Sequence, residues 1–241
     1  LMEKYFEDPD SLTKEEIVEA IRKATIAMDI TPILCGSAFK NKGVQPLLDA
    51  VAAYLPTPDD VPAIVGKQPD SEREEPRTPS ASSFCGLIFK IASALFAGQM
   101  TFVRVYSGVL ASGGTVFNPR TRKTERIGTL VKLHSNKRAE IERLEAGDIA
   151  AVIGLSVGVT GDTICEKRYP ILLEGTEFPQ PVIDIAVEPK TKADQPKLEN
   201  AISSIEREDP SFHKKIDPDT GQIIISGMGE LHLEIVLDRL S

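Results

Sequence analysis

The chain has 241 residues, 41% of them hydrophobic and 27% charged, which is the composition of an ordinary globular protein. Its net charge of −8 argues against a protein that binds nucleic acid over its whole surface. No apolar run reaches the roughly 18 residues of a membrane-spanning helix, and the acidic N-terminal residues do not suggest a secretory leader. The composition therefore predicts a cytoplasmic protein with no membrane partner.

Residues 1–55 carry the pattern of two helices around one short strand. Thr13 followed by Glu16 forms a capping box, and apolar residues recur at helical spacing, so a helix is expected over 11–28. The apolar residues 33–35 predict a short strand, and a second amphipathic helix follows it. This fragment is too small to be a doubly wound sheet, so we expect the tail of one.

Residues 56–83 differ in composition from their neighbours. Six of the 17 prolines lie in this segment, together with the highly charged stretch 70–75. Proline and charge at this density are typical of a linker or an exposed loop. We therefore expect a linker here.

Residues 84–170 change to short alternating strands separated by glycine turns. Five strands are recognisable by their β-branched and alternating residues, at 86–91, 101–106, 115–117, 127–131 and 149–153. Because no helical pattern separates them, an all-β barrel or sandwich is expected. Residues 160–163 could suggest a phosphate-binding loop, but their place after a strand favours a turn.

Residues 171–241 predict an α+β domain. Its expected elements are a strand at 182–187, a helix at 194–208, strands at 212–216 and 222–226, and a helix at 228–240. A ferredoxin-like domain has the order βαββαβ, so its last strand is expected to be missing. The final helix is expected to turn Leu231, Ile235 and Leu237 inward and its acidic residues toward water.

The strand, glycine turn and helix over 220–240 read TGQIIISGMGELHLEIVLDRL. This string resembles the third domain of the elongation factor G family of translational GTPases. The resemblance includes the stretches 102–109, 125–128, 160–163, 187–190 and 208–212, and it covers essentially the whole chain. It implies an α/β remnant of a P-loop GTPase domain at 1–55, a linker at 56–83, an all-β translation-factor barrel at 84–170 and a truncated α+β ferredoxin-like domain at 171–241.

The resemblance also implies a function for the intact protein, which is GTP-dependent translocation of tRNA and mRNA on the ribosome. The implied cofactors are GTP or GDP and Mg²⁺. The implied partners are ribosomal RNA and proteins and the tRNA–mRNA complex, with the intact factor a cytoplasmic monomer. Two alternatives stay open, a ribosome-protection or ribosome-recycling GTPase and a non-enzymatic ribosome-binding module.

Residues 35–40, after the expected strand, resemble the guanine-recognition loop of translational GTPases. The resemblance assigns backbone contacts with the guanine to Ser37 and Ala38, with Phe39 following them. No G-x-x-x-x-G-K-[ST] phosphate loop occurs in the sequence. Residues 41–44 start as Asn-Lys but end in valine, so they lack the carboxylate that pairs with guanine. We therefore expect no catalytic residue and no metal site here, and a fragment inactive as a GTPase by itself.

Residues 120–143 form a basic stretch in an acidic protein, with eight basic residues against three acidic ones. Such a stretch can contact phosphates, although a solvated hairpin with scattered charge is the alternative. The candidate ribosome contacts are Arg120, Arg122, Lys123, Lys132, Lys137 and Arg138.

The three cysteines, Cys35, Cys85 and Cys165, are odd in number and widely spaced. Free thiols are therefore expected, each buried as a small apolar side chain. The histidines have no metal-ligand spacing, and His232 between two leucines is expected to be a packing or surface histidine.

Overall fold

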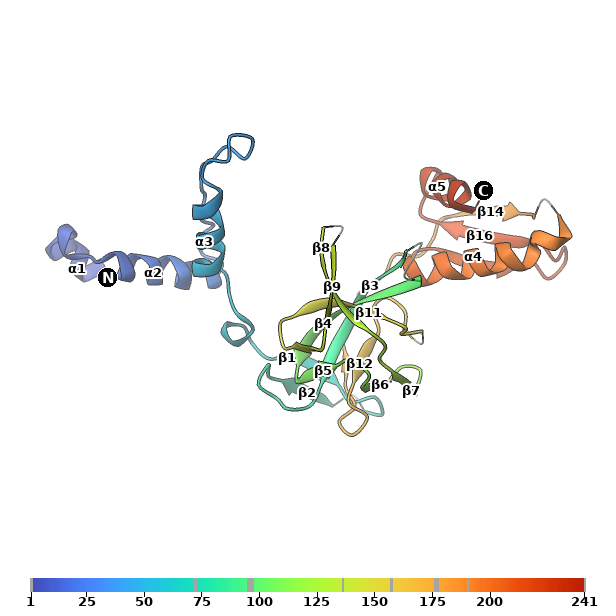
Figure 1. Ribbon diagram of the computed structural model, residues 1–241, viewed down its shortest axis with the longest axis horizontal. Coiled ribbons are helices and arrows are strands. Elements are labelled where there is room, and N and C mark those ends of the chain that lie inside the picture. The colour runs from blue at the N-terminus through green and yellow to red at the C-terminus, as the bar shows by residue number, and fades with distance from the viewer. Residues whose placement is uncertain are drawn as a thin grey trace. The chain divides into compact units, whose positions relative to one another are not determined.

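The computed structural model describes residues 2–71, 73–94, 98–135, 137–156, 158–175, 178–189 and 191–240 (Figure 1). The chain divides into two compact units, Leu1–Pro62 and Ala63–Ser241. The first unit is helical and the second is mostly β. Within the described ranges, no helix is both long enough and apolar enough to cross a membrane.

The first unit consists of helices joined by loops. Its elements are α1 (Met2–Glu7), α2 (Lys14–Ile26) and α3 (Val44–Tyr54), with short 3-10 turns at Pro9–Ser11 and Pro58–Asp60. The expected capping box is confirmed at the start of α2. Glu16 N donates to Thr13 Oγ1 at 3.2 Å, and Thr13 N donates to the Glu16 carboxylate at 2.9 Å. These bonds satisfy two of the amides that the first turn of a helix leaves open.

The strand expected at 33–35 does not form. Residues 31–36 run without a strand partner, and the one bridge nearby, Ser37 to Lys42, closes the loop that follows. A strand needs a neighbour for its amides and carbonyls, and the described part of the first unit offers none. None of the described residues in α1, α2 and α3 is buried, so this unit has no core of its own.

The second unit begins with a hairpin where the linker over 56–83 was expected. β1 (Ile64–Lys67) pairs with β2 (Glu74–Arg77), and also with β13 (Leu172–Leu173) about a hundred residues later. The expectation of a bare linker was wrong for these strands. Pro76 is tolerated because β2 lies at the edge of this three-stranded sheet, where a missing amide breaks no ladder.

Ten strands follow, and all five that the sequence predicted are among them. They are β3 (Cys85–Ala94), β4 (Gly98–Ser107), β5 (Val109–Ala111), β6 (Thr115–Asn118), β7 (Lys123–Arg126), β8 (Leu130–His134), β9 (Lys137–Ile141), β10 (Arg143–Glu145), β11 (Ile149–Ile153) and β12 (Thr163–Cys165). β8 begins later than the expected 127–131. Residues 127 and 128 bond elsewhere, because Ile127 N donates to the Gly114 carbonyl at 2.7 Å and the Gly128 carbonyl accepts from Gly113 N at 3.4 Å.

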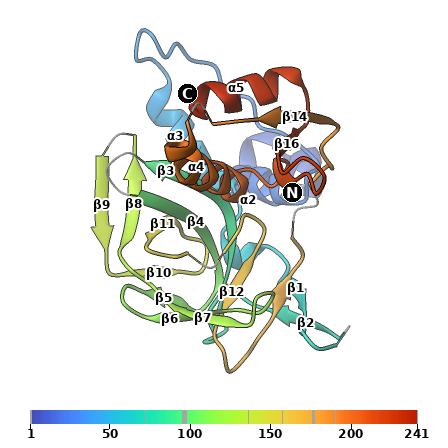
Figure 2. The ribbon, with the colours of Figure 1, turned by 90° about the vertical axis from the view of Figure 1, so that its right-hand side faces the viewer.

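Eight of these strands form one antiparallel sheet in the order β7-β6-β12-β3-β4-β11-β8-β9, and β5 pairs with β10. Val116 near one end of this order and Leu130 near the other belong to the same buried cluster, together with Ile88 and Val103. A flat sheet would hold these strands apart, so the sheet curls around its core, as Figure 2 shows.

A smaller core lies on the outer face of this curled sheet. Cys85 of β3 stands directly opposite Cys165 of β12, and both are fully buried beneath Ile171 and Leu173. Both thiols are free, as expected. Cys35 is free but exposed, contrary to the expectation, because nothing in the described part of the first unit packs over its segment.

The last part has the expected order βαββα. Its elements are β14 (Ile183–Val187), α4 (Gln195–Glu208), β15 (His213–Ile216), β16 (Ile223–Gly227) and α5 (Glu230–Leu240), with a 3-10 turn at Lys192–Asp194. The antiparallel sheet has the order β14-β16-β15. Side chains of both helices, including Ile202 and Leu233, pack against Ile223 and Ile225 in one core.

The face that α5 turns to this core differs from the expected one. Leu233 and Val236 are buried, whereas Leu231 is 69% and Ile235 is 53% exposed. The expectation for these two exposed residues was wrong. Gly227 is the physical reason, because a side chain there would come within 2.7 Å of Leu233. The bare glycine lets Leu233 pack against the strand, which fixes the rotation of the helix.

Candidate nucleotide loop and RNA-binding surface

Residues 36–43 form a tight loop before α3, held by its own backbone. Ser37 N donates to the Lys42 carbonyl at 2.9 Å, and Lys42 N donates back to the Ser37 carbonyl at 3.0 Å. Asn41 N donates to the Ala38 carbonyl at 3.0 Å, with Asn41 in the left-handed region at φ 51°. The loop therefore has a defined shape that does not depend on a ligand.

The loop contains all three residues assigned to guanine contact, but it does not leave them equally available. The Ser37 amide is already used by Lys42. The Ala38 amide has no backbone acceptor among the described residues, and the Phe39 side chain is fully exposed. Of the two amides assigned to guanine contact, Ala38 is therefore the one that can serve an incoming acceptor.

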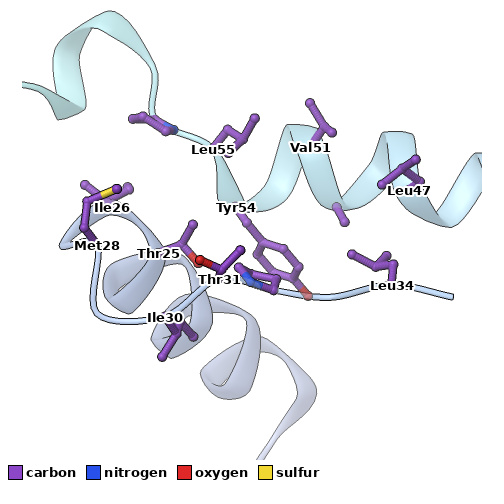
Figure 3. Close-up of a pocket in the computed structure, with 13 residues that line it drawn as sticks. Thr25, Ile26, Met28, Ile30, Thr31, Leu34, Leu47, Val51, Tyr54 and Leu55 are labelled. Carbon is purple, nitrogen blue, oxygen red and sulfur yellow. The ribbon is translucent and has the colours of Figure 1, made fainter.

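An apolar pocket of about 330 Å³ lies elsewhere in the first unit (Figure 3). It is bounded by the end of α2, the segment after it and one face of α3, with Met28, Leu34 and Val51 among its lining residues. Ser37, Ala38 and Phe39 do not line it. Hydroxyl groups are its main polar side-chain groups, so it suits neither a phosphate nor a metal ion.

Two of the candidate basic residues are held by carboxylates of the same chain. Arg120 donates from Nε to Asp162 Oδ1 at 2.5 Å and from Nη2 to Oδ2 at 2.8 Å. This hydrogen bonding raises the pKa of Arg120. Arg122 forms an ion pair with Asp70 in the turn between β1 and β2. Both guanidinium groups are therefore partly neutralised by carboxylates of their own chain.

The remaining candidates are less restrained. Lys123 is exposed at the start of β7, and Lys132 on β8 makes a long contact of 3.4 Å with Asp148. Lys137 and Arg138 are exposed on β9, and neither has an ion pair among the residues the structure describes. Figure 1 shows the β8–β9 hairpin projecting from the curled sheet. These two cations are thus the best placed of the six to meet phosphates.

Other motifs that drew attention in the sequence have structural explanations. Residues 159–162 form a turn, in which Asp162 N donates to the Val159 carbonyl at 3.1 Å, and Thr163 already begins β12. His232 accepts from Met228 N at Nδ1 and lies 3.0 Å from Asp209 through Nε2. Over the described ranges, no group of three histidine, cysteine or acidic side chains could hold a metal ion.

Comparison with protein families assigns the two folded parts of the second unit. Residues 83–167 match the family model described as Elongation factor G domain 2. Residues 178–241 match the model described as Elongation Factor G, domain III. The two matches together cover more than half of the chain and follow one another along it.

The chain belongs to the elongation factor G family. A crystal structure of a protein from Thermus thermophilus matches 99% of this chain, with a TM-score of 0.75 and 25% sequence identity. The chain spans 34% of that protein. The curled sheet is thus domain 2 of elongation factor G, and the βαββα part belongs to domain III of this translation elongation factor family.

The carboxylates that hold Arg120 and Arg122 of elongation factor G domain 2 were not predicted from the sequence, and Asp70 lies outside the residues that match this domain. Asp162 lies 42 residues from Arg120, and Asp70 lies 52 residues from Arg122. Neither ion pair can be predicted from helical or strand periodicity, because each joins two turns that are far apart in the sequence. A buried aspartate in a turn gives a weak hint, since it must find a partner.

Proposed function

We propose that this chain is part of an elongation factor G that drives GTP-dependent translocation of tRNA and mRNA on the ribosome. The observation that carries the proposal is the succession of domain 2 and domain III on one chain. The intact factor would bind GTP or GDP with Mg²⁺ and act as a cytoplasmic monomer. Residues 1–55 would be the end of its GTPase domain.

The topology of the last domain supports the ferredoxin-like fold that we propose for it. In a ferredoxin-like domain the last strand in sequence lies at one edge of the sheet, and the first strand in sequence lies next to it. Here β14 lies at the edge of the described sheet, beside β16. A further strand at this edge would complete the ferredoxin-like domain that we propose for residues 171–241.

The nucleotide chemistry of the intact factor would need groups that this sequence does not contain. Phosphate loops and Mg²⁺ supply most of the stabilisation in GTP hydrolysis, and the sequence has no phosphate-loop motif. What the chain would add is the loop around Ser37, Ala38 and Phe39, with the Ala38 amide donating to the guanine. Its contribution would be base recognition rather than catalysis.

The same proposal assigns the β8–β9 hairpin to ribosomal RNA. Lys137 and Arg138 carry charge without a partner carboxylate among the described residues, so they can neutralise phosphates without first breaking an ion pair. Lys123 and Lys132 would assist. Arg120 and Arg122 would contribute less, because each is already paired.

Ribosome co-sedimentation of the intact factor tests this assignment. The Lys137→Glu/Arg138→Glu variant should bind more weakly at low salt, with a deficit that shrinks as salt rises. Lys167→Glu/Arg168→Glu is the matched control, since it reverses an adjacent exposed lysine–arginine pair elsewhere in the second unit. Equal binding of wild type and the Lys137→Glu/Arg138→Glu variant at low salt would refute the contact.

A translocation assay separates the proposed activity from the alternatives. Ribosome-dependent GTP hydrolysis with movement of tRNA and mRNA supports an elongation factor. Hydrolysis without movement would indicate a ribosome-protection or ribosome-recycling relative, and binding without hydrolysis a non-enzymatic module.

A further inference from the structure

A bulge in β3 brings three side chains together on the outer face of domain 2. The register with β4 pairs Ile88 with Val103 and then Lys90 with Phe102, so Phe89 is an extra residue. A bulge sets two residues of one strand against one of its partner, and it re-aims the side chains. Here Phe89 and Lys90 both flank the Phe102 ring.

The distances show that these side chains form one surface. The ring centroids of Phe89 and Phe102 lie 6.2 Å apart, with the rings tilted by 54°. Lys90 Nζ lies 5.9 Å from the Phe102 centroid. Phe89 is 42% exposed, and Phe102 is half-buried. One ring is therefore open to solvent while the other supports it.

The neighbouring strand extends the surface with a second cation. Alternate residues of a strand share a face, so Phe102, Arg104 and Tyr106 of β4 point outward while Val103 and Val105 are buried. The Arg104 guanidinium lies 5.2 Å from the Tyr106 ring centroid. Tyr106 packs against the small core under β13, so the open part is the aromatic stripe formed by Phe89, Lys90, Phe102 and Arg104.

The charge of the aromatic stripe is uncompensated. Neither Lys90 nor Arg104 has a carboxylate partner among the described residues, although the chain carries a net charge of −8. The residues opposite on β11 are Ile149, facing Arg104, and Ala151, facing Phe102, and neither is charged. An exposed ring that shares a face with two cations lacking carboxylate partners is complementary to a base with its adjoining phosphates.

We propose that the aromatic stripe binds an unpaired segment of RNA. An unstacked base would lie on Phe89, and phosphates on either side would meet Lys90 and Arg104. The inference rests on the proposed function, because the RNA in question would be an unpaired stretch of ribosomal RNA. A duplex hides the faces of its bases within the stack, so it offers this surface phosphates alone.

Fluorescence anisotropy with the whole 241-residue chain tests this. The probes are a labelled single-stranded RNA of about 12 nucleotides and the duplex of the same sequence. The single strand should bind more tightly than the duplex. Phe89→Ala should weaken single-strand binding about tenfold at every salt concentration, as loss of one base stack does.

The charge variant gives a different signature. Lys90→Gln/Arg104→Gln should reduce the slope of log affinity against log salt by about 1.4, the value for two single-strand phosphate contacts. Phe89→Tyr keeps a ring and should retain binding. Tyr169→Ala is the control, since it removes a different exposed ring that lies 5.5 Å from an arginine, Arg168.

Equal affinity for single strand and duplex would overturn the proposal, and so would unchanged binding by Phe89→Ala. No RNA binding by a wild-type chain with the expected circular dichroism would point instead to an acidic protein partner and also refute it. If ribosome association falls in Lys137→Glu/Arg138→Glu while the stripe variants match wild type, this inference alone fails and the proposed function stands.

Discussion

Arg120 and Asp162, 42 residues apart in sequence, join the turn after β6 to the turn before β12 through a two-point ion pair. Asp162 is 4% exposed, and it also accepts from Asn118 Nδ2 at 2.8 Å and from Val159 N at 3.1 Å. Such bidentate, charge-assisted bonds are geometrically specific. The carboxylate therefore organises this end of domain 2.

Replacing Asp162 should destabilise the fold. Asp162→Ala is expected to lower the free energy of unfolding by about 1 to 3 kcal/mol, because it leaves the buried Asn118 amide without its acceptor, whereas the half-exposed Arg120 can still be solvated by water. Arg122→Ala, which removes a largely exposed ion pair, should change it by less than about 1 kcal/mol. Urea unfolding measures both, and equal effects would contradict the structural role of Asp162.

Thiol labelling should distinguish the three cysteines. Burial raises the pKa of Cys85 to about 12 and also raises the pKa of Cys165. Since the thiolate is the reactive form, one thiol, exposed Cys35, should react quickly in the native chain and all three in denaturant. Cys35→Ser should remove the fast phase, and a surviving fast phase would refute the prediction.

The contact between α1 and α2 should show itself in an acid titration. Lys4 Nζ donates to the Glu16 carboxylate at 2.7 and 2.8 Å, and this bond, with the Thr13 amide, lowers the pKa of Glu16 from 4.5 to about 2. A lowered folded pKa stabilises the fold above pH 4.5, and that contribution is lost as pH falls toward about 2.

NMR titration of the Glu16 carboxyl group measures this shift directly. Lys4→Gln should move its midpoint upward. Lys23→Gln is the control, because Lys23 bonds to Glu19 on the same helix and lowers the pKa of that residue instead. A Glu16 midpoint that is unchanged in Lys4→Gln would show that the contact between Lys4 and Glu16 is absent in solution.

Hydrogen exchange should rank the strands of domain III. Ile225 of β16 pairs with Ile185 of β14 on one side and with Lys214 of β15 on the other, so β16 is central. Its amides should exchange more slowly on average than those of β14 and β15, and β14 should also exchange faster than β4. Protection of β14 equal to that of β4 in dilute solution would mean that another strand covers it.

Calorimetry should find no micromolar affinity of the 241-residue chain for GTP, because the sequence lacks a phosphate loop. In the intact factor, Ala38→Pro should weaken nucleotide binding, since proline has no amide to donate. Ala38→Gly keeps the amide and should bind as the wild type does. Equal nucleotide binding by Ala38→Pro would show that the Ala38 amide does not contact the guanine.

Local patterns predicted the elements whose cause is local. The capping box of Thr13 and Glu16 fixed the start of α2, and the apolar run at 149–153 coincides with β11. The hairpin of β1 and β2 could not be foreseen, because β13, which pairs with β1, lies about a hundred residues away. The rotation of α5 likewise depends on the contact between Gly227 and Leu233.

The candidate RNA surface was likewise only partly predictable from the sequence. Counting basic residues located the stretch 120–143, but it could not show which cations are free. That distinction depends on Asp70 and Asp162, which the fold brings to Arg122 and Arg120. The aromatic stripe was invisible for a similar reason, since it requires the bulge that places Phe89 beside Phe102.

The pairing of β1 with β13 also decides how domain 2 would respond to mechanical load. Gly66 faces Leu173 and Lys67 faces Leu172 in antiparallel register, so the chain enters and leaves domain 2 at the same end of this pair. Tension applied through the preceding and following segments would open the pair one hydrogen bond at a time, as a zipper opens. The curled sheet would bear the tension only after β1 and β13 had separated.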